Sequence, residues 1–223
     1  MGKRISRGYD FLARFYDLLA FALFGNRLKK CREALIQDLP STGEALILGG
    51  GTGSFLRALA KTGKTRSILF VDLSPRMVEK ARRGMKPTRL EAAHECSLEF
   101  QTANVLSLPS GPRFDLICTN FFLDSFEPAE LKRITDHVHG MLCPDGLWYF
   151  SDFQGGPRPL LALLYWFFRV TCRISARRLP DYEGEFRRLG LVLEKEKWTA
   201  NRMLRTAIYR KPIKPSASIQ NFN

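Results

Sequence analysis

Short apolar runs alternate along the chain with segments in which apolar residues recur every three or four positions. The runs are typical of buried strands and occur near residues 44–48, 67–72, 98–103, 114–119 and 146–152. Helical spacing follows the first two runs and returns at about 128–141, ahead of the fifth. Strands that alternate with helices usually form a parallel sheet. The pattern therefore predicts an α/β fold.

The two ends of the chain extend this pattern. Residues 9–24 and 26–38 have helical spacing, and an aromatic, basic segment at 159–176 has it again. Residues 191–198 and 205–210 are predicted to form an antiparallel strand pair that closes the sheet. We therefore expect a Rossmann-like, seven-stranded, mostly parallel sheet with helices on both faces.

Length and composition favour one domain with a large core, because 45% of the 223 residues are hydrophobic. We expect this domain to span residues 1–212, followed by a flexible tail at 213–223. Within it we distinguish a helical N-terminal segment at 1–40, a core of alternating strands and helices at 44–152 and a second helical segment at 156–190.

A glycine-rich turn follows the first predicted strand. The strand ends at Leu48, glycines stand at positions 49, 50, 51 and 53, and an aspartate, Asp72, ends the next strand 19 residues after Gly53. Glycines have no side chain to keep a ligand away from the backbone, and they adopt backbone torsions that other residues rarely can. A carboxylate about 20 residues later can accept hydrogen bonds from ribose hydroxyls. The arrangement predicts a nucleoside-containing cofactor.

The glycine spacing distinguishes between two cofactor classes. A dinucleotide site needs G-x-G-x-x-G, but the third position is Ser54 or Leu56, depending on the register. Glycines at 49, 51 and 53 instead resemble the first motif of class I S-adenosylmethionine-dependent methyltransferases. The later strands resemble successive strands of that fold, and Tyr-Asp pairs near residues 9 and 16 resemble the UbiE-like quinone and lipid methyltransferases. An NAD(P)-dependent oxidoreductase is the less favoured enzyme class.

The resemblance implies a cofactor-binding core at 44–152 with a site for S-adenosylmethionine, a helical N-terminal lid at 1–40 and a helical acceptor-side segment at 156–190. The residues of the site would be Gly49, Gly50, Gly51, Thr52, Gly53, Asp72, Leu73, Asn104, Val105 and Asn120. Asp72 would bind the ribose, and Asn104 would bind the adenine edge where the family usually has aspartate. The family also carries an acidic residue two positions before the first glycine, to hold the methionine end of the cofactor, whereas this chain has Ile47.

Candidate catalytic residues follow the fourth and fifth predicted strands. Methyl transfer needs a base only when the acceptor must lose a proton, and Asp124 is the first candidate for it, with Asp152 second. Either aspartate could instead cap a helix or anchor a loop. Phe121, Phe122 and Phe126 surround Asp124 in sequence and favour a small lipophilic or aromatic acceptor.

The net charge of +13 is concentrated at the two ends of the chain. The segments 1–40, 41–155 and 156–223 carry net charges of +4, 0 and +9. Such a distribution favours an anionic partner such as a membrane surface, against which the 159–176 helix could lie; alternatively, that helix covers the sheet. Nucleic acid is disfavoured as a substrate, because Asn120 lacks the two following prolines of enzymes that methylate DNA amines.

The cysteines and histidines bear on the compartment and on metal binding. The five cysteines form no paired motif, so the sequence predicts a cytoplasmic protein, and the three histidines form no recognisable ligand set, so it predicts no metal site. Membrane association is an additional expectation, from the charge distribution. A non-catalytic module that binds anionic lipid or RNA on the same scaffold is the alternative to an enzyme. The oligomeric state is not predicted.

Overall fold

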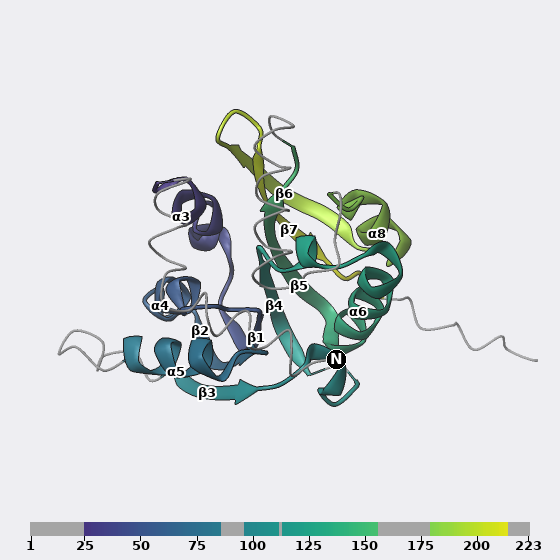
Figure 1. The fold of residues 1–223 in the computed structure, drawn as a ribbon. Coiled ribbons are helices and arrows are strands. Elements are labelled where there is room, and N and C mark those ends of the chain that lie inside the picture. Colours follow the sequence, from purple (N-terminus) through teal and green to yellow (C-terminus); the bar gives the residue numbers. More distant parts are fainter. Residues whose placement is uncertain (1–24, 86–95, 112, 156–178, 214–223) are drawn as a thin grey trace, which may run out of the picture.

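The computed structural model describes residues 25–85, 96–111, 113–155 and 179–213 (Figure 1). The predicted helices at 9–24 and 159–176 lie outside the described residues, as does the predicted tail from residue 214 onward. The described part contains a central sheet with helices packed on it, and no helix in these ranges combines the length and the apolar character needed to cross a bilayer.

The sheet contains seven strands in the order β3-β2-β1-β4-β5-β7-β6. Their bounds are Thr42–Leu48 (β1), Thr65–Asp72 (β2), Ser97–Thr102 (β3), Phe114–Asn120 (β4), Leu142–Phe153 (β5), Val192–Thr199 (β6) and Leu204–Arg210 (β7). Strands β3, β2, β1, β4 and β5 run parallel, whereas β7 pairs antiparallel with both β5 and β6. The predicted mostly parallel sheet with an antiparallel closing pair is confirmed.

The direction in which strands are added reverses at β1. This strand pairs with β2 on one side, where Leu48 is opposite Val71, and with β4 on the other, where Leu48 is opposite Thr119. The connections from β1 and β4 therefore leave in opposite directions. In open parallel sheets, ligands bind in the crevice outside the carboxyl ends of two such strands.

Helices cover both faces of the sheet, as predicted (Figure 1). The α-helices are α3 (Arg27–Arg32), α4 (Ser54–Ala60), α5 (Pro75–Gly84), α6 (Pro128–Met141) and α8 (Tyr182–Arg188), and three 3₁₀ turns are η1 (Ile36–Asp38), η3 (Val105–Ser107) and η4 (Leu123–Ser125). Helices α4 and α5 contribute to one apolar core together with Ile47 and Phe70 of the sheet. Helices α6 and α8 contribute to the core on the opposite face, which includes Trp148 and Phe150.

Local sequence signals explain several helix ends. The Ser74 hydroxyl accepts a hydrogen bond from the Met77 amide, and Pro75 occupies the first position of α5, so both residues favour the start of the helix at this point. Asn26 precedes α3 but makes no side-chain capping bond. Helix α8 lies within the predicted 156–190 helical segment, and Asp181 caps it by accepting from the Gly184 amide at 2.9 Å.

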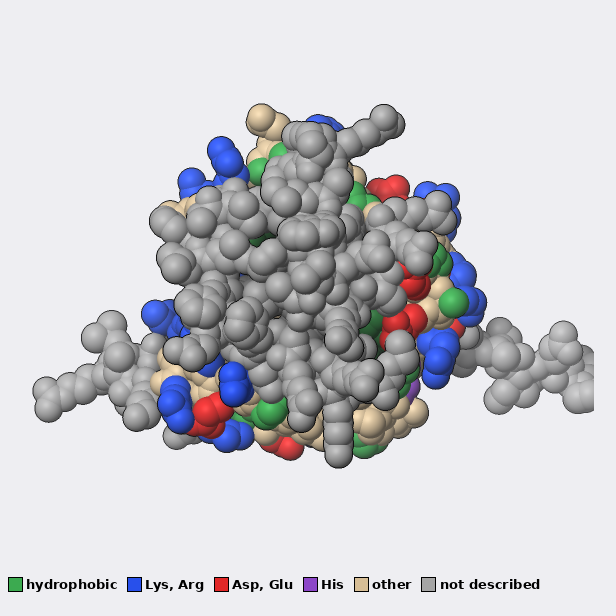
Figure 2. All heavy atoms as spheres, viewed as in Figure 1, with side chains coloured by type: hydrophobic (Ala, Val, Ile, Leu, Met, Phe, Trp, Pro, Cys, Tyr) green, Lys and Arg blue, Asp and Glu red, His purple; other side chains and the backbone are tan. Residues whose placement is uncertain are grey.

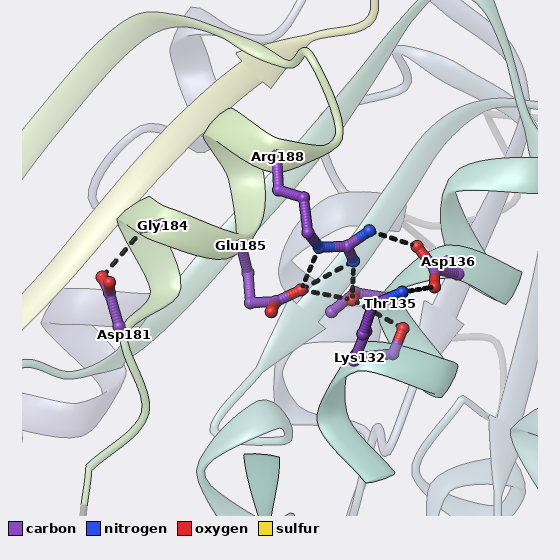
Figure 3. A network of polar contacts seen from close by, with 7 residues as sticks. All are labelled: Lys132, Thr135, Asp136, Asp181, Gly184, Glu185 and Arg188. Carbon is purple, nitrogen blue, oxygen red and sulfur yellow. Dashed lines mark hydrogen bonds and ion pairs between the residues drawn. The ribbon is translucent and has the colours of Figure 1, made fainter. Parts of the chain in front are cut away.

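Polar contacts connect α8 to α6 (Figure 3). The guanidinium of Arg188 forms ion pairs with Glu185 at 2.7 Å and with Asp136 at 2.6 Å. The buried Thr135 hydroxyl donates to the Glu185 carboxylate at 3.0 Å, and Lys132 pairs with Asp136 on the surface of α6. This network joins α8 to α6 on the face of the sheet that carries Trp148 and Phe150.

Candidate active site

The turn after β1 brings bare backbone to the carboxyl edge of the sheet. Gly49 and Gly51 have φ values of +60° and +56°, which favour glycine. A Cβ at Gly51 would meet no atom within 4 Å among the described residues, whereas a Cβ at Gly49 would lie 2.4 Å from the Phe122 ring. The backbone of Gly51 is therefore open to a ligand.

Two other glycines of the predicted cofactor turn allow close packing. A Cβ on Gly50 would lie 2.1 Å from the Phe70 ring of β2, and a Cβ on Gly53 would lie 2.8 Å from Ala81 of α5. Gly53 precedes α4, so its small size lets α4 and α5 approach each other. These packing roles could not be found from glycine spacing, because Phe70 and Ala81 come from later elements.

Asp72 connects the end of β2 to the glycine turn. Its Oδ2 atom accepts a 2.9 Å hydrogen bond from the Gly51 amide, and its Oδ1 atom accepts one of 2.9 Å from the Ser74 amide. The residue is buried, with 9% of its surface exposed. A carboxylate oxygen has two lone pairs, so each can also accept from a hydroxyl of a bound sugar.

A pocket lies between the carboxyl ends of β1 and β4, at the reversal point of the sheet. It is lined by Arg32, Ile47, Leu48, Gly49, Gly50, Gly51, Thr52, Phe55, Asn120 and Phe121. Five of these residues belong to the predicted cofactor set. Arg32 was not predicted, because no local pattern connects a residue of α3 with the glycine turn.

The other predicted cofactor residues continue along the same edge of the sheet. Leu73 directly follows β2, and Asn104 lies two residues beyond the end of β3. The Asn104 side-chain oxygen accepts a 2.9 Å hydrogen bond from the Leu106 amide and so begins the η3 turn, which leaves the amide NH₂ as the group for an adenine. Val105 is buried in the core below this turn.

The structure brings the two candidate catalytic aspartates together. Asp124 lies in the η4 turn after β4, and Asp152 lies near the end of β5 with none of its surface exposed. The Asp124 amide donates to Oδ2 of Asp152 at 3.3 Å, and the Phe153 amide donates to Oδ1 at 2.9 Å. Asp152 therefore anchors the η4 loop, which was the alternative role considered for it.

Burial changes the acidity of both aspartates. Asp124 as a whole is half-buried, but burial of its carboxylate raises the pKa to about 6. A hydrogen bond from the Ser125 hydroxyl acts in the opposite direction and lowers this pKa. Burial, and then the nearby Asp124 charge, raises the pKa of Asp152 well above its ordinary range. The pair therefore retains a proton at weakly acidic pH, as expected for buried carboxylates that are close together.

Aromatic side chains lie beside this pair. Phe121 and Phe153 contact each other with ring centroids 5.3 Å apart, and Phe122 and Phe126 do so at 5.1 Å. Phe121 has φ of 51°, an uncommon value for a bulky residue, and its amide donates to the Ser151 carbonyl at 2.8 Å. Backbone strain of this kind is frequent at functional sites.

The described residues form no group of three or more histidine, cysteine, aspartate or glutamate side chains arranged to hold a metal ion.

The residues of the edge fit the parts of S-adenosylmethionine. The open face of Gly51 leaves room for a ligand beside the backbone, and Asp72 offers acceptors to ribose hydroxyls. In the pocket, Nε of Arg32 and Nδ2 of Asn120 are buried and lack a hydrogen-bond partner among the described residues. Such donors suit an anionic or carbonyl group of a ligand.

Comparison with known proteins gives a family match in the middle of the sequence. Residues 46–148 match the family model of a methyltransferase domain. This range contains the glycine turn, Asp72 and β4. No curated protein matches the chain in sequence.

Solved structures share the fold. The N-methyltransferase NodS from Bradyrhizobium japonicum WM9, in complex with S-adenosyl-L-homocysteine, aligns with a TM-score of 0.61 and 18% identity over 83% of this chain and 88% of that chain. The putative methyltransferase in a complex with the Haloferax volcanii Trm112 activator aligns with a TM-score of 0.69 and 18% identity, over 92% and 98% of the two chains. An O-methyltransferase family 2 protein from Planctomyces limnophilus, in complex with apigenin, aligns with a TM-score of 0.65 and 17% identity, over 89% and 61%.

Proposed function

We propose that this S-adenosylmethionine-dependent methyltransferase methylates a small, apolar or aromatic acceptor that loses a proton in the reaction. The enzyme class and the cofactor follow from the methyltransferase domain at 46–148 and the class I fold. Both observations favour a methyltransferase over a nicotinamide-dependent oxidoreductase. The acceptor and the roles of the site residues are the proposal, and the carboxylate pair of Asp124 and Asp152 beside four phenylalanines carries it.

The proposed cofactor-binding residues lie along the carboxyl edge of the sheet, and each part of the cofactor would contact a different strand end. The bound cofactor supplies a methyl group on a sulfonium, which is already activated for displacement. Asp72 and Asn104 would hold the nucleoside at the ends of β2 and β3, and Gly49 to Thr52 with Asn120 would hold the amino acid end. Correct alignment of donor and acceptor can lower a barrier by roughly 7–11 kcal/mol, so these binding contacts are themselves catalytic.

The carboxylate pair would receive the acceptor's proton. Asp124 lies nearer the surface than Asp152, which is fully buried and holds the η4 loop through the Asp124 amide. We therefore assign proton acceptance to the Asp124 carboxylate and the positioning of its loop to Asp152. A base with a pKa of about 6 is largely ionised at neutral pH and still basic enough to accept a proton.

The phenylalanine rings would form the apolar wall of the acceptor site. Phe121 and Phe122 follow β4, and Phe153 ends β5, so the rings lie at the same edge as the aspartate pair. One structural neighbour of this fold was solved in complex with apigenin, which is an aromatic molecule. Lipid and quinone acceptors of the UbiE-like group belong to the same apolar class, although the Tyr-Asp pairs near residues 9 and 16 lie outside the described residues.

The test is transfer of an isotopically labelled methyl group to extracted metabolites by the full-length protein. We expect label in a lipophilic product, a loss of at least about tenfold in rate for Asp124→Asn, and no change for Glu127→Gln, which alters a neighbouring carboxylate that makes no capping bond. Cofactor binding without any labelled product from such extracts would contradict the proposal and favour the non-catalytic binding module.

Association with an anionic membrane from the cytoplasmic side is a second part of the proposal. Arg27, Lys29 and Lys30 are exposed on α3, while the basic segment at 159–176 lies outside the described residues. In Figure 2, lysine and arginine side chains surround the rim of the molecule in this view, interspersed with acidic ones. Flotation with anionic liposomes should recover the protein at low salt, and replacement of Arg173, Arg177 and Arg178 by glutamate should abolish recovery. Equal flotation of both proteins, or RNA binding in place of lipid binding, would contradict it.

A further inference from the structure

The pocket between β1 and β4 contains an arginine near the position where an acidic residue was expected. Ile47 is almost fully buried at the end of β1 and contributes only apolar surface. Arg32, from α3, is the one charged side chain among the described residues that line the pocket. This end of the site is therefore cationic rather than anionic.

The backbone of Arg32 is held firmly against the sheet. Its carbonyl accepts a 2.7 Å hydrogen bond from the Tyr149 hydroxyl of β5, and the carbonyl of the preceding Cys31 accepts one of 2.6 Å from Thr206 of β7. Cys31 has no exposed surface. Helix α3 is thus joined to two strands, which fix the backbone from which the Arg32 side chain extends to the pocket.

The pocket contains buried side-chain donors from Arg32 and Asn120. One terminal nitrogen of Arg32 donates to the Ser54 hydroxyl at 3.3 Å, while Nε has no partner among the described residues. Asn120 contacts the Ser151 hydroxyl through its side-chain oxygen, and its Nδ2 is likewise buried without a partner in the described part. A group with several acceptor atoms and no donor, such as a carboxylate, satisfies both.

We propose that Arg32, assisted by Asn120, binds the α-carboxylate of the cofactor's amino acid end and makes this carboxylate a requirement for tight binding. The planar guanidinium can offer two parallel N–H groups to a carboxylate, which a single ammonium cannot. The inference rests on the assignment of S-adenosylmethionine as cofactor and adds a selection rule to it: adenine nucleosides that lack the carboxylate bind weakly.

Calorimetric titration of the full-length protein tests this rule without turnover. The probes are S-adenosylhomocysteine and 5′-methylthioadenosine, which share the nucleoside and the thioether, but only the first has the amino acid end. We expect Arg32→Met to weaken S-adenosylhomocysteine binding by about 10- to 100-fold and to leave methylthioadenosine binding unchanged. Arg32→Lys should restore part of the loss, and Lys30→Met, an exposed change two residues away, should have no effect.

The outcomes separate this inference from the proposed function. Equal weakening of both ligands by Arg32→Met would assign Arg32 a structural role and overturn the inference, as would unchanged binding of both. In either case wild-type binding of S-adenosylhomocysteine would leave the methyltransferase assignment intact. A wild-type protein that binds neither ligand would remove both.

Discussion

The backbone amide of Gly51 donates a 2.9 Å hydrogen bond to Oδ2 of Asp72, and this bond joins the turn after β1 to the end of β2. The same carboxylate accepts from the Ser74 amide at the start of α5. One buried side chain therefore sets the spacing between the glycine turn and the neighbouring strand end. The two features that the sequence placed 19 residues apart act as a single unit in the fold.

Replacing Asp72 should weaken cofactor binding strongly. In Asp72→Ala, two backbone amides lose a charged acceptor and the ribose loses its proposed partner. Hydrogen bonds to charged groups contribute roughly 1.5–3 kcal/mol each, so we expect S-adenosylhomocysteine affinity to fall by at least about tenfold. Calorimetry measures it. Glu79→Ala, on the exposed surface of α5, is the matched control, and equal effects of both variants would refute a specific role for Asp72.

Alanine at Gly51 should block the ligand with only a limited loss of stability. Its methyl group would meet no described atom, although the left-handed backbone costs roughly 1–2 kcal/mol. Alanine at Gly49 has the same backbone cost and also a clash with the Phe122 ring. We expect Gly49→Ala to melt at a lower temperature than Gly51→Ala, and Gly51→Ala to lose S-adenosylhomocysteine binding. Undiminished binding by Gly51→Ala would show that the ligand does not approach this backbone.

The pH dependence of activity should report on Asp124. Burial raises the pKa of this carboxyl to about 6, and a base works only in its ionised form. The rate at low acceptor concentration should therefore rise with pH through about 6 and level off above it. In Asp124→Asn we expect a lower rate without this ascending limb. If the limb persists in the variant at the same pH, another group is responsible for it.

The same aspartates should make stability depend on pH. Carboxyls whose pKa is raised in the folded state bind protons more tightly there than in the unfolded chain, where the pKa is about 4. The free energy of unfolding should therefore fall as pH rises from about 4 through about 6, and further while Asp152 ionises. Urea denaturation at pH 5 and pH 8 measures the fall. It should be smaller in Asp152→Asn, and an identical fall in both proteins would contradict the assignment.

Removing Arg188 should weaken the contact between α8 and α6 without changing cofactor binding. Its ion pairs with Asp136 and Glu185 are partly exposed, and such pairs contribute about 1 kcal/mol or less each (Figure 3). Arg188→Ala should lower the free energy of unfolding by about 1 kcal/mol, with a smaller difference at high salt. Arg187→Ala, on the exposed side of the same helix, is the control. Equal destabilisation by the two variants would assign the loss to helix propensity.

Features that depend on neighbouring residues could be predicted from the sequence. The apolar runs predicted the parallel strands and the closing antiparallel pair, and Ser74 followed by Pro75 marked the start of α5. The fifth strand begins at Leu142 rather than near 146, and it contains an irregularity, since Asp145 has φ of 64° and the pairing with β4 shifts register between Phe114 and Leu116. Hydrophobic spacing does not reveal such an irregularity.

The sequence by itself determined the order of the strands along the chain, the bare turn after the first of them and the acidic end of the second, since each depends on a few adjacent side chains. Only the tertiary structure decided which distant residues meet. Arg32 reaches the pocket because α3 is fixed to β5 and β7, and Asp124 meets Asp152 because β4 and β5 are adjacent in the sheet. Contacts of this kind depend on how the strands are arranged, and no local periodicity encodes that arrangement.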